Sequence, residues 1–238
     1  MDYVNILKDK KLSVSSINRK LVVLEQIYEH LPLPKINPIK GLRLKTELVK
    51  ALPQPLNYKS LSQYLSDFPT ETKMQKQLKL ILSLIHHQAL RASEIRALKL
   101  HHLQLKKGLL EVPSVLRSDT RFLALTAPQA LGFQNFIQSI RPSFPNAENI
   151  DYLFISSTGS SNILPTLNRF QVKLKKQIPH LKNFGHWRTS VIIEWLNHQS
   201  ILQVQSKLGH RFASSTERYK MHKIKTLQED FFLHHPLK

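Results

Sequence analysis

The sequence has no cysteine, no long apolar run and few acidic residues, and each absence excludes a class of protein. Without cysteine among its 238 residues, the chain can form no disulfide and use no thiolate chemistry. No apolar stretch approaches the roughly 18 residues of a membrane span, and no secretory signal pattern begins the chain. We therefore expect a soluble protein that is not exported and has no membrane partner.

Acidic residues are scarce, since 16 Asp and Glu stand against 35 Lys and Arg and leave a formal net charge of +19. The basic residues are spread along the chain, so we expect a basic folded surface that meets a polyanion, most often nucleic acid. The few acids form no clustered triad, which argues against a two-metal nuclease or transposase. Adjacent pairs such as His86-His87 point apart on a helix and do not indicate a metal site.

Helical periodicity dominates, and we predict a mostly α protein with one small antiparallel β-sheet, an α+β fold. Apolar residues spaced by three and four predict a helix that begins after a cap at Ser13. A proline cluster ends this helix, and residues 32–57 have the composition of a connector. We therefore expect a helical segment at 1–50 and a larger domain at 51–238.

The larger domain should hold several more helices and three strands. Helices are expected at 74–88, after a cap at Ser93, after Thr126 with Leu131, Phe136, Ile137 and Ile140 facing inward, after a cap at Thr166, and at 186–198 and 201–208. Strands are expected at 109–115 and 121–125, joined by a polar turn, and at Tyr152 to Ile155.

Four short elements bear residues that suit chemistry at a phosphate. They are Ala89-Leu-Arg91-Ala-Ser93-Glu94, His186-Trp-Arg188-Thr, Lys207-Leu-Gly209-His210, and Tyr219, nine positions after that histidine. Two guanidiniums can bind phosphate oxygens with paired hydrogen bonds and remain charged as negative charge grows in the transition state. Nearby cations activate a tyrosine hydroxyl, and histidine can donate a hydrogen bond or move a proton. The four elements indicate phosphodiester transesterification with no metal, ATP or other cofactor.

With these elements in this order, residues 58–225 resemble the tyrosine recombinase (phage integrase) family. The family pattern runs Leu-Arg-x-Ser-Glu-Leu, a hairpin lysine, His-x-Leu-Arg, Leu-Gly-His and a nine-residue step to tyrosine. The resemblance implies that Arg91 and Arg188 bind the scissile phosphate, His210 assists, and Tyr219 is the nucleophile. Glu94 would be the buried acid of the first motif.

The resemblance also implies an activity, partners and a domain arrangement. The chain would be a site-specific recombinase or integrase of a bacterium or mobile element, working through a 3′-phosphotyrosine intermediate. Double-stranded DNA would be its partner, a homo- or hetero-tetramer its active form, and the cytoplasmic nucleoid its location. Residues 1–50 would be a truncated helical core-binding segment before the catalytic domain. Type IB topoisomerases share the chemistry, but the spacing from Leu-Gly-His to tyrosine favours recombinases.

Two positions depart from the family pattern. Gly185 occupies the place of the family's first histidine, and His186 follows one residue later. Leu116 occupies the place of the hairpin lysine, with Arg117 beside it. That lysine is thought to protonate the leaving 5′ oxygen, and arginine is a poor proton donor. Arg117 and His186 are therefore tentative catalytic or phosphate-binding residues, with an ordinary phosphate contact and a non-catalytic loop histidine as the alternatives.

Other interpretations remain open at this point. Lys106 or Lys107 could replace the hairpin lysine if the hairpin register differs from the one given above. The departures also fit a degenerate, catalytically impaired family member that acts as a DNA-binding regulator. An RNA-binding module is a third hypothesis, without the aromatic stacking pattern of the common RNA modules. The tail 220–238 either covers its own core or packs onto a neighbouring protomer.

Overall fold

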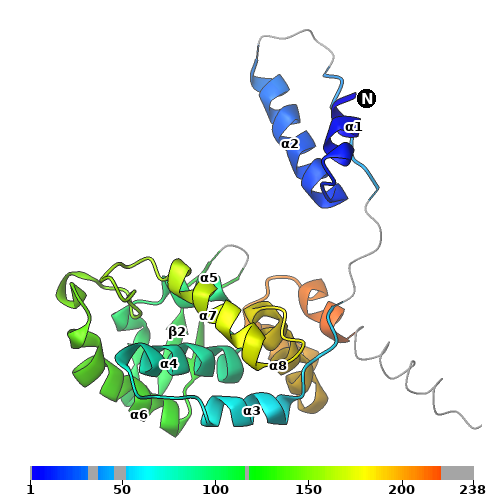
Figure 1. Cartoon of the computed structure of the whole chain (residues 1–238). Coiled ribbons are helices and arrows are strands. Elements are labelled where there is room, and N and C mark those ends of the chain that lie inside the picture. The colour runs from blue at the N-terminus through cyan, green and yellow to red at the C-terminus, as the bar shows by residue number, and fades with distance from the viewer. Residues whose placement is uncertain (1, 32–36, 46–51, 116–117, 221–238) are drawn as a thin grey trace, which may run out of the picture. The chain divides into compact units, whose positions relative to one another are not determined.

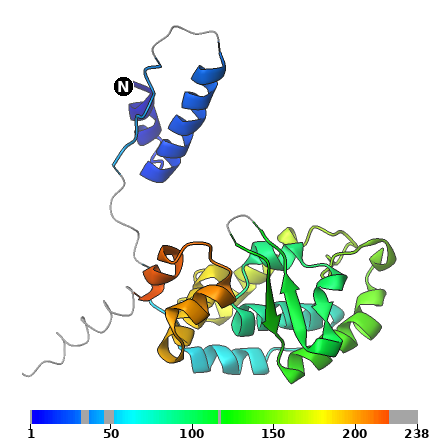
Figure 2. The same cartoon turned by 180° about the vertical axis from the view of Figure 1, so that it is seen from behind.

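The chain divides into two units, Met1–Ala51 and Leu52–Lys238, drawn in Figure 1 and from behind in Figure 2. A computed structural model describes residues 2–31, 37–45, 52–115 and 118–220. The described residues are mostly helical with one three-stranded antiparallel sheet, so the predicted fold class is confirmed. The predicted alternatives for the tail concern residues after 220, which lie outside the described part.

The first unit is a pair of helices, α1 (Asp2–Asp9) and α2 (Val14–His30). As predicted, Ser13 caps α2, and its side chain accepts a hydrogen bond from the backbone N–H of Ser16. The small core of this unit contains four residues, Val4, Leu7, Ile17 and Leu21.

The second unit contains the remaining long helices and the sheet. Its helices are α3 (Tyr58–Ser66), α4 (Lys73–Gln88), α5 (Ala92–Ala97), α6 (Ala127–Asn135), α7 (Leu164–Gln177), α8 (Phe184–His198) and α9 (Ile201–Leu208). The strands β1 (Leu103–Gln104), β2 (Leu109–Val112) and β3 (Arg121–Ala124) pair in that order. Between β2 and β3, Val112 pairs with Arg121 and Leu109 with Ala124. The core lies around the buried α4 and α8, with Trp187, Phe133, Phe136 and Phe154 as its largest fully buried side chains.

Two predicted helix caps are displaced. The helix expected after Ser93 begins at Ala92 with Arg91 as its N-cap, because the Glu94 carboxylate accepts the Arg91 N–H. Thr166 does not cap α7 but lies buried inside it, since Pro165 fits the first turn of a helix that begins at Leu164. The caps at Thr126 and the bounds 201–208 are confirmed.

The predicted strand at Tyr152 to Ile155 is wrong. Only Tyr152 forms an isolated bridge, to Lys99, while the side chain of Gln77 hydrogen-bonds the backbone N–H and C=O of Ile155. This amide takes the place of a neighbouring strand, so no ladder is needed to satisfy the buried backbone of Ile155.

The predicted inward position of Leu131 is also wrong, because its side chain is 68% exposed and Phe133 faces the core instead. The strand predicted at 109–115 ends at Val112, because Pro113 has no N–H to donate.

Candidate active site

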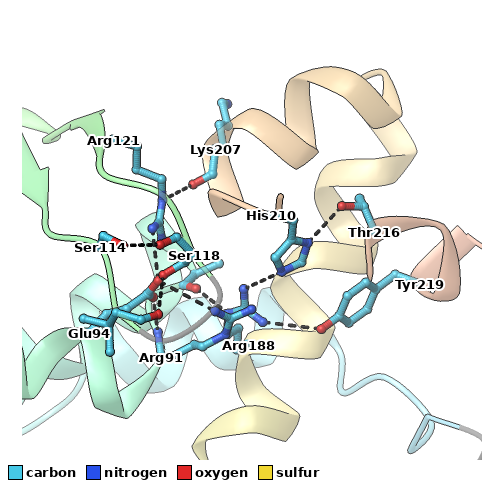
Figure 3. Close-up of polar contacts among 12 residues, drawn as sticks. Arg91, Glu94, Ser114, Ser118, Arg121, Arg188, Lys207, His210, Thr216 and Tyr219 are labelled. Atoms are coloured by element: carbon cyan, nitrogen blue, oxygen red, sulfur yellow. Dashed lines mark hydrogen bonds and ion pairs between the residues drawn. The ribbon is translucent and has the colours of Figure 1, made fainter. Parts of the chain in front are cut away.

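Arg188 lies buried in the second turn of α8, at the centre of a polar cluster (Figure 3). Its Nε donates to the backbone oxygen of Ala89 at 2.6 Å. Its two terminal nitrogens reach the hydroxyl of Tyr219 at 3.4 Å and Nε2 of His210 at 3.5 Å. One guanidinium therefore joins a backbone carbonyl, a phenol and an imidazole that come from distant parts of the chain.

Glu94 holds the first motif in place. Its fully buried carboxylate accepts the backbone N–H of Arg91 at 2.8 Å and a terminal nitrogen of Arg121 at 3.0 Å. The side chain of Arg91 lies 4.0 Å away. Burial raises the pKa of Glu94, but hydrogen bonds from Arg121 and Arg91 and the nearby positive charge outweigh burial and lower it below its usual value. Glu94 is therefore ionised at neutral pH and offsets part of the arginine charge.

Arg121 is a residue of the site that sequence reasoning missed, since it was interpreted only as the start of a strand. It is buried on β3, and its Nε donates to the backbone oxygen of Lys207 at 2.7 Å. It thereby connects Glu94 to the end of α9. The alternation of side chains along β3 could have indicated its inward position, because Arg121 and Leu123 face inward while Phe122 and Ala124 are exposed.

Gly209 must be glycine for two reasons. Its φ of +64° lies in the left-handed region, where α9 ends. A Cβ at this position would also lie 2.9 Å from a terminal nitrogen of Arg121 and 2.9 Å from the backbone oxygen of Asp119. The sharp turn at Gly209 brings the next residue, His210, to a bridge with Ser118 beside the β2–β3 hairpin.

His210 is buried and hydrogen-bonded on its inner side. Its Nδ1 lies 2.9 Å from Oγ1 of Thr216. Burial, together with the charges of Arg188, Arg91 and Arg121, lowers the pKa of His210 from 6.5 to about 4. The ring is therefore neutral at neutral pH, and an anion placed among these arginines would raise its pKa again.

Tyr219 belongs to a helical stretch that begins at Ser214, and its side chain is buried. Its ring is nearly parallel to that of His210, with 6.5 Å between centroids and 10° between planes. The structure thus brings together three predicted site residues, Arg188, His210 and Tyr219, and links Arg91 to them through Glu94 and Arg121. Guanidiniums, a neutral imidazole and a phenol at one place can bind a phosphate and attack it.

His186 lies elsewhere, against the segment that begins the second unit. Its Nδ1 accepts the backbone N–H of Lys182 at 3.2 Å, and its Nε2 donates to the backbone oxygen of Gln54 at 2.7 Å. One turn along α8, Oγ of Ser190 accepts the N–H of Leu56 at 2.9 Å. Both ring nitrogens of His186 thus have backbone partners, and no hydrogen bond in the described residues joins it to the cluster. The geometry favours the non-catalytic interpretation.

Lys106 and Lys107 lie at the wrong end of the hairpin to replace the family lysine. They precede Gly108, whose carbonyl accepts the N–H of Leu125 at the end of β2–β3 remote from the connecting turn. Ser118, in that turn, is the residue that bridges to His210. Leu116 and Arg117 lie outside the described residues, and the role of Arg117 stays a prediction.

Two further findings concern the described residues alone. No group of three or more His, Asp or Glu side chains in them is arranged to hold a metal ion. No helix in them has the length and apolar character that crossing a membrane requires.

Comparison with known proteins identifies the family. Residues 55–225 match the family model described as "Phage integrase family". The chain belongs to this family. It is 25% identical over 242 residues to tyrosine recombinase XerC of Lactobacillus delbrueckii subsp. bulgaricus, covering 96% of this chain and 79% of that protein. It is 27% identical over 262 residues to tyrosine recombinase XerD of Rickettsia bellii, covering 99% and 82%.

Solved structures have the same fold. The XerH site-specific recombinase bound to difH substrate, in a pre-cleavage complex, superimposes with a TM-score of 0.71 at 16% identity, covering 95% of this chain and 67% of that one. The Tn1549 transposon integrase in complex with transposon right end DNA gives 0.68 at 15% identity, covering 98% and 83%.

Proposed function

We propose that this member of the phage integrase family is a site-specific DNA recombinase that cleaves and rejoins DNA through a 3′-phosphotyrosine intermediate. The observation that carries the proposal is the single guanidinium of Arg188, which contacts both the Tyr219 hydroxyl and Nε2 of His210. A nucleophile, a proton acceptor and a phosphate-binding cation are thereby held at one point.

In this mechanism Arg188 and Arg91 bind the non-bridging oxygens of the scissile phosphate. The Tyr219 oxygen forms a bond to phosphorus, its proton passes to Nε2 of His210, and the bond from phosphorus to the 5′ oxygen breaks. The departing 5′ oxygen takes a proton from solvent. Rejoining reverses each step, with the 5′ hydroxyl as nucleophile and protonated His210 returning its proton to the tyrosine. One phosphodiester is exchanged for another, so no external energy source is consumed.

Duplex DNA is the proposed substrate. The net charge of +19 supports a polyanionic partner, and similar folds are those of recombinases whose structures contain DNA. We further propose that residues 1–50 form part of a DNA-contacting core-binding segment, that 51–238 form the catalytic domain, and that a tetramer assembles on paired sites in the nucleoid.

Covalent trapping on DNA tests the proposal. The chain and its Tyr219→Phe variant are incubated in EDTA with supercoiled plasmid that contains the DNA flanking its own gene, then quenched in detergent. We expect a protein–DNA adduct and relaxed plasmid with the parent chain only, and equal salt-sensitive binding by both proteins. An adduct that persists in Tyr219→Phe would exclude Tyr219 as the nucleophile.

A catalytically impaired DNA-binding regulator is the second candidate. Lys106 and Lys107 lie at the far end of the hairpin, and both nitrogens of His186 are occupied, so none of these three residues supplies the function of the family's hairpin lysine or first histidine. This candidate predicts salt-sensitive binding with no adduct from the parent chain. Leu116→Lys would then be the first change to restore cleavage. Gly185→His is less suitable, because a Cβ there meets Oδ1 of the helix cap Asn183 at 3.0 Å.

A further inference from the structure

We propose that Thr216 is a positioning residue that fixes the His210 imidazole in one tautomer, with hydrogen on Nδ1 and the lone pair of Nε2 toward Arg188. The consequence for catalysis rests on the proposed function, whereas the tautomer itself is a property of the free protein. Thr216 lies three residues before Tyr219 in the fourth chemical element, Ser-Thr-Glu-Arg-Tyr, and the sequence pattern assigned it no role.

The placement of Thr216 is specific. It is fully buried and its Oγ1 lies 2.9 Å from Nδ1 of His210. It precedes Tyr219 by three residues in the same helical stretch, so the two side chains share one face of the helix. Glu217 and Arg218, between them, are exposed. The hydroxyl of Thr216 therefore joins the helix that contains the nucleophile to the histidine.

The donors around the ring determine its tautomer. The terminal nitrogen of Arg188, 3.5 Å from Nε2, can only donate a hydrogen bond. Nε2 must then present its lone pair, and in a neutral ring the hydrogen lies on Nδ1 and is donated to Oγ1 of Thr216. The lowered pKa of His210 supports the neutral form. The charged groups that act on the ring from neighbouring elements are Arg188, Arg91, Arg121 and Glu94.

Removing the Thr216 hydroxyl should shift the tautomer equilibrium of the His210 ring. Without an acceptor at residue 216, a hydrogen on Nδ1 is buried and unpaired, which is unfavourable. The tautomer with hydrogen on Nε2 then gains population, and it points a hydrogen at the donor Arg188 and cannot accept the proton of Tyr219. Thr216 would thus act on the reaction through His210 without touching the phosphate.

Nitrogen-15 NMR of the free protein, labelled at its 12 histidines, tests the proposal. Long-range proton–nitrogen correlations distinguish protonated from unprotonated ring nitrogens, and a His210→Asn sample assigns the signals of His210. We expect the parent chain and Thr216→Ser to show a single tautomer with hydrogen on Nδ1. Thr216→Val, which keeps the shape but loses the hydroxyl, should show a mixture or the opposite tautomer.

Thr166→Val is the matched control. Thr166 is also buried, and its Oγ1 has no hydrogen-bond partner among the described residues, so the same substitution removes a hydroxyl that bonds to nothing there. It should leave the His210 signals unchanged. Circular dichroism melts establish that each variant is folded before its spectrum is compared.

Activity supplies a separate readout. If the parent chain forms the covalent adduct, Thr216→Val should slow adduct formation roughly tenfold or more without weakening DNA binding. Thr216→Ser, which keeps the hydroxyl, should form the adduct at about the parent rate. Hydrogen on Nε2 in the parent chain would overturn the proposal whatever the variants do, as would an unchanged tautomer in Thr216→Val. An inactive parent with the expected tautomer shift would count against the recombinase function alone.

Discussion

Two buried histidines lie beside α8 and contact consecutive residues of it, His86 with Trp187 and His210 with Arg188. Each has its pKa lowered from 6.5 to about 4. At His86 every polar atom of the ring has a neutral partner: Nδ1 accepts from Trp187 at 3.3 Å, and Nε2 lies 3.0 Å from Oγ of Ser62. Ser62 in turn donates to the backbone oxygen of Tyr58.

The causes of the two shifts differ, and so do their consequences. At His86 the cause is burial, with a smaller effect of His87. At His210 burial is joined by three guanidiniums, and only Nδ1 has a hydroxyl partner. A bound phosphate can cancel the arginine charge but cannot undo burial. A histidine whose two ring nitrogens pair with neutral groups stabilises the fold. A histidine that faces arginines whose charge is only partly offset changes its pKa when an anion binds.

The largest loss of stability should come from Glu94→Ala, which removes the carboxylate from the charged surroundings of His210. Arg121 would lose its buried carboxylate partner, and an uncompensated buried charge costs roughly 3–5 kcal/mol. Urea unfolding measures the change. Arg211→Ala is the control, because it removes an ion pair with Asp119 in which both side chains are about half exposed, and should cost under about 1 kcal/mol. Equal losses in the two variants would contradict a charged core at this site.

The sequence predicts a feature of the fold or the site when that feature depends on residues close together in the chain or on a recognisable motif. The caps at Ser13 and Thr126 follow from side chains that bond the next turn, and the motif order predicted which residues meet at Arg188. Arg121 and Thr216 were missed because their roles come from contacts 86 and 6 residues away, to Lys207 and His210. The strand at Tyr152 failed for the same reason, since a distant Gln77 satisfies Ile155.

The pH dependence of stability is the second prediction. Because both histidines have a folded-state pKa of about 4, below the 6.5 of an unfolded chain, the unfolded state binds protons first as the pH falls. Stability should therefore be constant above about pH 7 and decline between pH 6.5 and 4, on the order of 2–3 kcal/mol for each histidine. Urea unfolding at several pH values measures this slope. His87 and His102, whose pKa values burial also lowers, add to the same slope. His86→Gln should therefore reduce the slope without abolishing it, and an unchanged slope would exclude His86 as a source.

Binding of DNA should separate the two histidines. The phosphate charge should raise the pKa of His210 by at least about one unit, and leave that of His86 within a few tenths of a unit. A proton NMR titration of the histidine ring signals, with and without a short duplex, follows both in one experiment. Equal shifts at both residues would show that the arginine cluster is not where the phosphate binds.

Ser62→Ala should cause the smallest loss of stability, and it tests the neutral surroundings of His86. It removes the partner of His86 Nε2 at a half-buried position, where water can replace part of the lost bond, so unfolding should become easier by about 1 kcal/mol. Neither DNA binding nor adduct formation should change, because the network ends at the backbone of Tyr58 and does not reach Arg188. Loss of adduct formation at full binding would mean that the two sides of α8 are coupled through Trp187, and that His86 is more than a structural residue.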